Sequence, residues 1–107
     1  MIVRTWRGRA APAQPDDYPE HFRFTVLPAL KAIKGFLGAQ LLRHDRPDEI
    51  EFLVLTRWST MDAIRAFAGE NVDQAVIEPE AAAALVSFDT TVRHYEVIEE
   101  ATVRSRK

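Results

Sequence analysis

The stretch that decides the fold is IEFLVLTRWSTMDAIRAFAG, which runs from Ile50 to Gly69. Its first nine residues form a near-continuous apolar run of the length of a β-strand. Ser59 or Thr60 can cap a short helix directly after it, and Gly69 ends that helix. The inward positions of this helix recur at helical spacing: Met61, Ile64 and Phe67. The stretch therefore predicts a strand followed at once by a short helix.

Working outward, FLGAQLLRH (36–44) and the turn DRPDE predict a strand that forms a hairpin with 50–58. A first strand is expected from Ile2 to about Arg9 and a last one from Phe88 to about Glu99. Asp17 can cap a helix that ends at Gly35, with a kink or division near Leu27 caused by Pro28. A last helical segment opens at Pro79, while ENVDQAVIE (70–78) fits no single pattern.

The resulting order is strand, helix, strand, strand, helix, strand. With right-handed crossovers this is an α+β, ferredoxin-like β-α-β-β-α-β fold, with the antiparallel strand order 4-1-3-2 and helices on one face. We expect a single domain over residues 1–100 and a short basic tail over 101–107.

Apolar residues occupy both faces of the middle strands. On the third strand Phe52 and Val54 oppose Leu53 and Leu55, and on the second Leu37, Ala39 and Leu41 oppose Phe36 and Leu42. Burial on both faces is typical of such strands, yet helices cover only one. We therefore predict a homodimer that packs sheet against sheet.

Composition excludes several classes of function. The chain has 107 residues, a formal net charge of -2 and no cysteine, so a nucleic-acid partner, disulfides and thiolate metal sites are not expected. No apolar run approaches the ~18 residues of a membrane span. We expect a cytoplasmic protein without metal.

Two strands offer candidate functional residues. His94 and Glu96 share a face of the last strand and form either an acid/base pair or a polar pair at a strand end. Arg4 and Trp6 share a face of the first strand, where they contact a flat anionic ligand or serve in a salt bridge and packing. Trp58 lines a pocket or packs in the core. His21 and His44 are expected to be exposed.

Three segments carry a family resemblance: RTWRG (4–8), EIEFLVLTRWSTMDAIRAFAGE (49–70) and FDTTVRHYEV (88–97). Together they resemble the antibiotic biosynthesis monooxygenase family of the dimeric α+β barrel superfamily. The resemblance implies a homodimer with a pocket between sheet and helices in each protomer. Its characterised members include enzymes that oxygenate phenols without metal or flavin, and haem-degrading monooxygenases.

The haem-degrading branch is the less favoured. The resemblance would require an asparagine in the first strand, a tryptophan in the helix after the third strand and a histidine about ten residues later. This chain has no asparagine in its first strand, Phe67 in the helix, and Val76 and Ile77 at the last position.

The resemblance thus implies a cofactor-independent monooxygenase for a small aromatic, phenol- or quinol-type substrate. His94 would be the base or orienting group, and Arg4 would hold the anion. The substrate-binding residues would be Trp6, Trp58, Phe67 and Glu96. The alternative is a non-catalytic ligand-binding or stress-associated barrel protein, with His94 structural.

Overall fold

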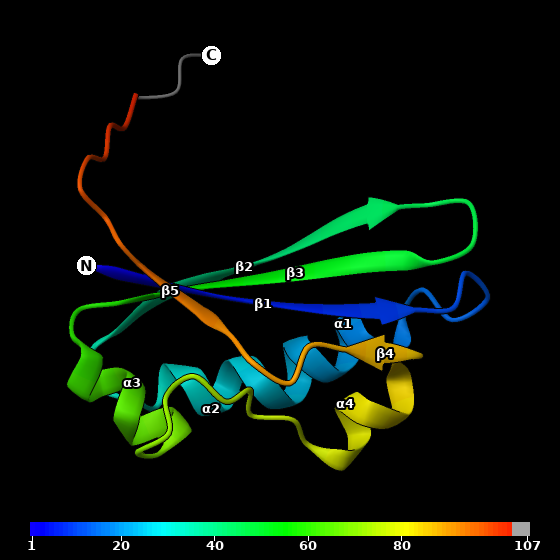
Figure 1. Cartoon of the computed structure of the whole chain (residues 1–107), viewed down its shortest axis with the longest axis horizontal. Helices are drawn as coiled ribbons and strands as arrows, with labels where there is room; N and C mark the ends of the chain where they lie inside the picture. The colour runs from blue at the N-terminus through cyan, green and yellow to red at the C-terminus, as the bar shows by residue number, and fades with distance from the viewer. Residues whose placement is uncertain (104–107) are drawn as a thin grey trace.

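The computed structural model describes residues 1–103 and contains one antiparallel sheet (Figure 1). Its strands are β1 (Ile2–Ala10), β2 (Phe36–Asp45), β3 (Ile50–Trp58), β4 (Ser87–Phe88) and β5 (Arg93–Glu96). Their order is β2-β3-β1-β4, with β5 also paired to β1. The predicted 4-1-3-2 order is therefore confirmed, with the last strand in two pieces.

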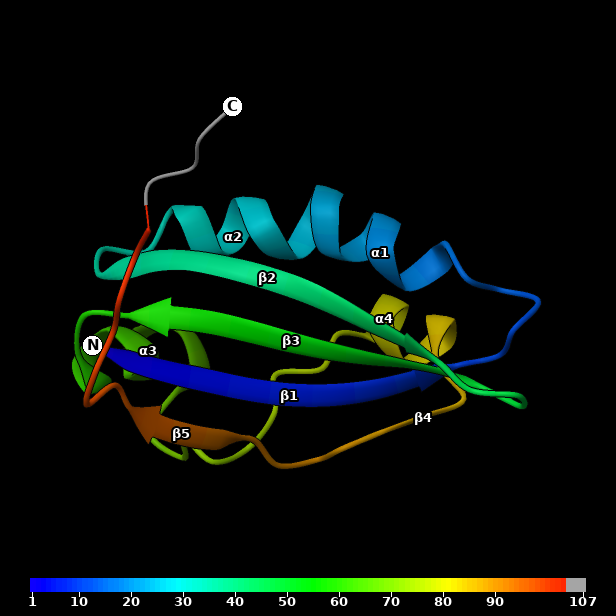
Figure 2. The ribbon, with the colours of Figure 1, turned by 90° about the horizontal axis from the view of Figure 1, so that it is seen from above.

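All helices lie on one face of this sheet, as Figures 1 and 2 show together. They are α1 (Asp17–His21), the π-helix η1 (Phe22–Val26), α2 (Leu27–Lys31), α3 (Met61–Ala68) and α4 (Pro79–Ala84). The ferredoxin-like α+β class is confirmed. Among residues 1–103, no helix has the length and apolar character needed to cross a membrane.

The first helical segment changes its hydrogen-bond register twice. The chain keeps right-handed helical angles at Phe22 and Leu27, but residues between them follow the wider π pattern before α2 begins. Pro28 lies in the first turn of α2, where its missing N–H is tolerated. The change expected near Leu27 is thus a switch from the π to the α pattern without a break in the helical backbone angles, and the helix ends at Lys31 rather than at Gly35 as predicted. The N-cap position is Asp16 rather than the predicted Asp17, and its side chain makes no capping hydrogen bond.

A β-bulge corrects the predicted faces of β2. The pairing shifts between Phe36 and Gly38, so Phe36 turns toward the helices and packs edge-on against Trp58. Leu37, predicted to share a face with Ala39, is 51% exposed instead. A bulge inserts one residue and reverses the alternation beyond it, which strict period-two counting misses.

The predicted last strand, Phe88 to about Glu99, is also corrected. Its middle leaves β1 and pairs with residues 73–75: Ala75 N–H donates to the Thr90 carbonyl, and Val92 N–H donates to the Asp73 carbonyl. Residues 69–78, here called the closing segment, contain no helix and one isolated bridge, between Gln74 and Thr91. The last part of the chain is thus hydrogen-bonded to β1 at both ends, as β4 and β5, and to the closing segment between them.

The cap of α3 is confirmed at Thr60, whose hydroxyl accepts a hydrogen bond from Ala63 N–H at 3.1 Å. Gly69 ends the helix with a φ of 85°. Gly35, before β2, also has positive φ, and a Cβ there would lie 2.6 Å from the Ala63 Cβ. The α2–β2 turn can therefore approach α3 only because residue 35 has no side chain.

The face of the sheet away from the helices carries apolar side chains that no described element covers. Register places Leu53 opposite Leu42, and Val3 opposite Tyr95, on this face. Leu42 is 41% exposed and Tyr95 50% exposed. We call this surface, formed by Val3, Leu42, Leu53, Leu55 and Tyr95, the open sheet face.

The predicted domain limits stay predictions. The cations on which the basic tail rests, Arg104, Arg106 and Lys107, lie outside the described residues.

Candidate functional site

A cavity of about 80 Å³ lies between the sheet, the first helical segment and the closing segment. Aromatic and aliphatic side chains form most of its wall, and polar groups enter it from several elements. The residues that matter for chemistry are Arg4, Trp6, Tyr18, His21, Phe67 and Glu78.

Arg4 is the cation of this cavity and is only 5% exposed. Its Nη1 donates to the Val72 carbonyl at 2.6 Å, and its Nη2 donates to the Gln74 carbonyl at 3.0 Å. Burial lowers the pKa of the guanidinium to about 10, while the Asp73 carboxylate acts in the opposite direction. Arg4 therefore fastens the closing segment to β1 and stays charged near neutral pH.

His94 lies on β5, directly opposite Arg4 of β1 in the strand register. Its Nε2 is 2.9 Å from Arg4 Nη1, and because a guanidinium only donates, Nε2 must accept. The proton of the neutral ring then sits on Nδ1, which is 3.5 Å from Asp73 Oδ1. Desolvation and the Arg4 charge lower the pKa of His94, and Asp73 opposes them. His94 is thus positioned as a neutral acceptor for Arg4.

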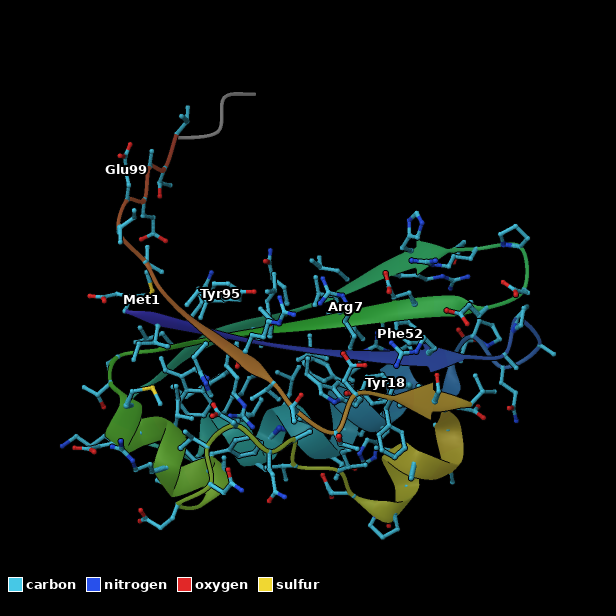
Figure 3. All side chains as sticks on the ribbon, viewed as in Figure 1. Met1, Arg7, Tyr18, Phe52, Tyr95 and Glu99 are labelled. Carbon is cyan, nitrogen blue, oxygen red and sulfur yellow. The ribbon has the colours of Figure 1, made fainter. Side chains whose placement is uncertain are left out.

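Aromatic rings wall the cavity. Trp6 and Tyr18 pack with centroids 5.7 Å apart, and Tyr18 also packs against Phe52. Figure 3 shows Tyr18 on the helix side of the sheet, with Arg7 and Tyr95 on the other. At the Arg4 end, the guanidinium carbon lies 5.8 Å from the centroid of Phe67. A flat ligand would meet ring faces and one fixed cation here.

Strand register separates Arg4 from Tyr18 along the cavity. Arg4 pairs with Thr56 and Trp6 with Val54, so Trp6 lies one pleat repeat further along β1. Tyr18 packs against Trp6 and, beyond it, against Phe52. The cavity thus has an Arg4 end and a Tyr18 end.

Sequence reasoning missed the polar pair at the Tyr18 end. His21, predicted to be exposed, has a side chain only 7% exposed, and its Nε2 lies 3.7 Å from Glu78 Oε1. The Tyr18 ring stands beside it at 6.1 Å between centroids. Burial, and secondarily the Glu78 charge, raise the pKa of Tyr18. No local signal marks this pair, because α1 and the closing segment meet only in three dimensions.

The residues predicted from the sequence separate into three groups. Arg4, Trp6 and Phe67 line the cavity. Trp58 is fully buried and does not line the cavity. Its ring stacks on Phe67, and Phe36 packs edge-on against it. His94 and Glu96 line a separate surface groove instead, and the carboxylate near His94 is that of Asp73. The roles predicted for these residues stay predictions. The structure confirms the expected exposure of His44.

In the part of the chain that the structure describes, no three metal-ligating side chains gather in one place.

Comparison with solved structures finds the same fold. A putative antibiotic biosynthesis monooxygenase from Bacillus cereus has 18% identity and a TM-score of 0.66, over 95% of this chain and 97% of that one. The ActVA-Orf6 monooxygenase of Streptomyces coelicolor, in complex with nanaomycin D, has 18% identity and a TM-score of 0.59, over 97% and 92%. The heme-degrader MhuD of Mycobacterium tuberculosis, with two hemes bound, has 23% identity and a TM-score of 0.58, over 95% and 100%.

A comparison with curated proteins finds no match to this chain. The family model for antibiotic biosynthesis monooxygenases, in contrast, matches residues 1–88, which is most of the chain. The α+β fold agrees with that match. The chain therefore belongs to the antibiotic biosynthesis monooxygenase family.

Proposed function

We propose that the protein is a cofactor-independent monooxygenase that oxidises a small phenol- or quinol-type substrate in the cavity between sheet and helices. The observation that carries the proposal is the buried Arg4 cation between aromatic walls. A fixed cation in a dry site stabilises the oxyanion of an ionised phenol far better than water-exposed charge would. His94 is the orienting group, because its Nε2 holds Arg4 Nη1.

The reaction needs only dioxygen as oxidant. The phenol first loses its O–H proton, and the phenolate then transfers one electron to dioxygen. The two radicals join through a new carbon–oxygen bond at the ring, and loss of water leaves the quinone. Each turnover consumes one dioxygen and releases one water. Arg4 would hold the phenolate oxygen, while Trp6 and Phe67 would orient the ring.

Substrate entry requires movement of the closing segment. A cavity of about 80 Å³ is well below the roughly 300 Å³ at which ligand pockets begin. Ala75, Val76 and Glu78 of the closing segment form part of its wall. We infer that this segment moves outward when the ring binds.

The small cavity also favours the second candidate, a non-catalytic ligand-binding or stress-associated protein. In that case the aromatic side chains would serve mainly as packing, and Arg4 and His94 would only hold the closing segment.

Haem fits the cavity poorly. The cavity measures only about 80 Å³, and Ala75 and Val76, which the closing segment contributes to its wall, have no lone pair for iron. The imidazole in its wall, that of His21, belongs to α1 and not to the segment after α3, where the haem-degrading branch would carry its histidine. The proposed reaction therefore involves no haem. A haemin titration is expected to leave the Soret band unchanged, and a shifted band that saturates at one or two haems per chain would contradict this.

We further propose that two copies pack through the open sheet face, which is apolar and uncovered by any described element. Like the site residues, the dimer is a prediction for this chain.

Oxygen uptake with anthrone and with hydroquinone tests the activity. Wild type should consume oxygen and form the quinone, and Arg4→Gln should lose most of kcat/KM, by roughly 10² to 10³-fold for one oxyanion donor. Arg23→Gln is the matched control, because Arg23 is exposed on η1 and lines neither the cavity nor the open sheet face. No uptake by wild type with either compound would leave the non-catalytic candidate.

A further inference from the structure

The Tyr18 end of the cavity contains a buried histidine nitrogen that lowers the stability of the fold unless a ligand supplies its hydrogen bond. His21 Nε2 is buried and has no hydrogen-bond partner among residues 1–103. Leaving such a group unpaired lowers the stability of the fold, because its lost hydration is not replaced. Buried polar atoms are rarely left unpaired without a functional reason. The cost therefore points to a hydroxyl or other polar group that completes the site.

The surroundings of His21 suit proton transfer. Its imidazole lines the cavity together with Tyr18 and Glu78. The carboxylate oxygen of Glu78 lies 3.7 Å from Nε2, too far for a hydrogen bond and near enough to stabilise a positive ring. The Glu78 side chain is 43% exposed, so its carboxylate keeps a path to solvent.

We propose that His21, with Glu78 as its charge partner, accepts the proton from the hydroxyl of a phenolic substrate in this cavity. The inference rests on the proposed function, because it assigns the proton acceptor that the oxidation requires. The O–H bond of the phenol breaks and an N–H bond forms on Nε2, while the electron pair stays on the phenolate oxygen. The resulting imidazolium faces the Glu78 carboxylate.

The assignment separates this role from that of His94. The Nε2 of His94 is already occupied by Arg4, so that ring can orient the guanidinium but has no free lone pair at this atom. His21 Nε2 has no such partner among residues 1–103, and His21 lines the cavity. Proton transfer to this atom requires the tautomer with its proton on Nδ1, which leaves the lone pair of Nε2 free. The substrate class that follows is a hydroxylated ring able to place its O–H at the Tyr18 end and a second oxygen at the Arg4 end, as in a quinol.

The first test is the pH profile of kcat/KM for oxygen uptake with hydroquinone. Wild type should show an acidic limb, where kcat/KM falls as the base becomes protonated. His21→Gln should lower kcat by about 10² to 10⁴-fold, the range of general base catalysis, and abolish that limb. The other titratable groups facing the cavity are Arg4, Tyr18 and Glu78, with His94 and Asp73 behind Arg4.

Glu78→Gln keeps the proposal testable if His21→Gln misfolds. Removing the carboxylate removes the charge partner of the imidazolium that proton transfer forms, so Glu78→Gln should lower kcat with hydroquinone while the fold is kept. His44→Gln is the control, since His44 is exposed at the end of β2. An unchanged rate and pH profile in His21→Gln would overturn the inference while leaving the proposed function intact.

A second readout needs no turnover. 4-Nitrophenol absorbs in the visible only as the phenolate, so binding to wild type at a pH where the free compound is neutral should produce that band. His21→Gln should lose it. A band that persists in His21→Gln assigns ionisation to another group and overturns the inference. A His21-dependent band in a protein that consumes no oxygen with hydroquinone or anthrone would instead sustain the inference and refute the oxygenase.

Discussion

At the scale of the residue, Arg4 joins three parts of the molecule. Its backbone belongs to β1, its guanidinium donates to the Val72 and Gln74 carbonyls, and its Nη1 also meets His94. A buried charge is tolerated only when hydrogen bonds replace its hydration. Here carbonyl dipoles and a neutral imidazole supply them.

Replacing Arg4 by Lys tests this arrangement without removing the charge. An ammonium on a flexible stem cannot serve two carbonyls in the fixed fork of a guanidinium. We expect the free energy of unfolding to fall by about 1–3 kcal/mol, because a buried carbonyl loses its donor. Urea denaturation measures the loss, and amide exchange of residues 72–75 should quicken. Arg23→Lys, which changes an exposed residue of η1, should change neither quantity.

His94 gives the stability a pH dependence whose sign follows from its lowered pKa. The unfolded chain binds the proton with the ordinary value of 6.5, and the folded protein binds it more weakly. Protonation therefore favours unfolding, so stability should be full above pH 6.5 and fall as the pH falls through 6.5 toward the lower folded value. The groups facing His94 are Arg4 and Asp73, with Glu96 on the same strand face.

Thermal unfolding between pH 5 and 8 measures this dependence. Wild type should lose stability on the acid side, and His94→Gln should flatten that part of the curve. A wild-type midpoint that does not change over this range, or an identical slope in His94→Gln, would contradict the assigned direction.

At the scale of the element, two glycines with positive φ bound the helices that shape the site. Gly35 links α2 to β2, where a Cβ would collide with Ala63 at 2.6 Å and Ser59 Oγ at 2.8 Å. Gly69 ends α3 and opens the closing segment, and a Cβ there meets nothing within 4 Å. Both residues adopt a positive φ that favours glycine. Only at Gly35 would a Cβ also clash with neighbouring atoms.

Alanine at each position separates the two effects. Gly69→Ala should lower the free energy of unfolding by about 1–3 kcal/mol, the cost of an L-residue in a disfavoured backbone region. Gly35→Ala should cost more, by roughly a further 1–3 kcal/mol of overpacking against α3. Urea denaturation of both variants checks the difference. Equal costs would mean that the α2–β2 turn can move away from α3.

At the scale of the whole molecule, the elements within residues 1–103 cover the sheet on one side only (Figures 1 and 2). Leu53 and Leu55 stand on the open sheet face between charged side chains such as Arg7 and Arg57. Burying one leucine against another molecule contributes about 1.5–3 kcal/mol. Several such residues in one patch offset the cost of association.

The oligomeric state tests this face. Light scattering at micromolar concentration should give about twice the 12.2 kDa chain mass. Leu55→Glu should yield the single chain, because it would bury an unpaired carboxylate. Phe24→Glu is the matched control, since Phe24 is 71% exposed on η1, on the helical side. A folded wild-type monomer would refute the sheet-to-sheet dimer.

The sequence by itself determined the class of fold and one end of the site. Alternation, caps and glycine stops are local, so most strands and a cap at Ser59 or Thr60 could be predicted without coordinates. The order 4-1-3-2 then followed from right-handed crossovers. Period-two spacing also placed Arg4 and Trp6 together. Sequence reasoning missed the bulge between Phe36 and Gly38, although an isolated glycine inside a strand, here Gly38, is a signal for one.

Only the tertiary structure decided which polar groups meet. His21 and Glu78 belong to α1 and the closing segment, and nothing local links them. Asp73, rather than Glu96, became the carboxylate beside His94 because the last strand leaves β1 to pair with residues 73–75. Helical and strand periodicity report which face a residue occupies. The partner on that face is set by how distant segments pack, which no local pattern records.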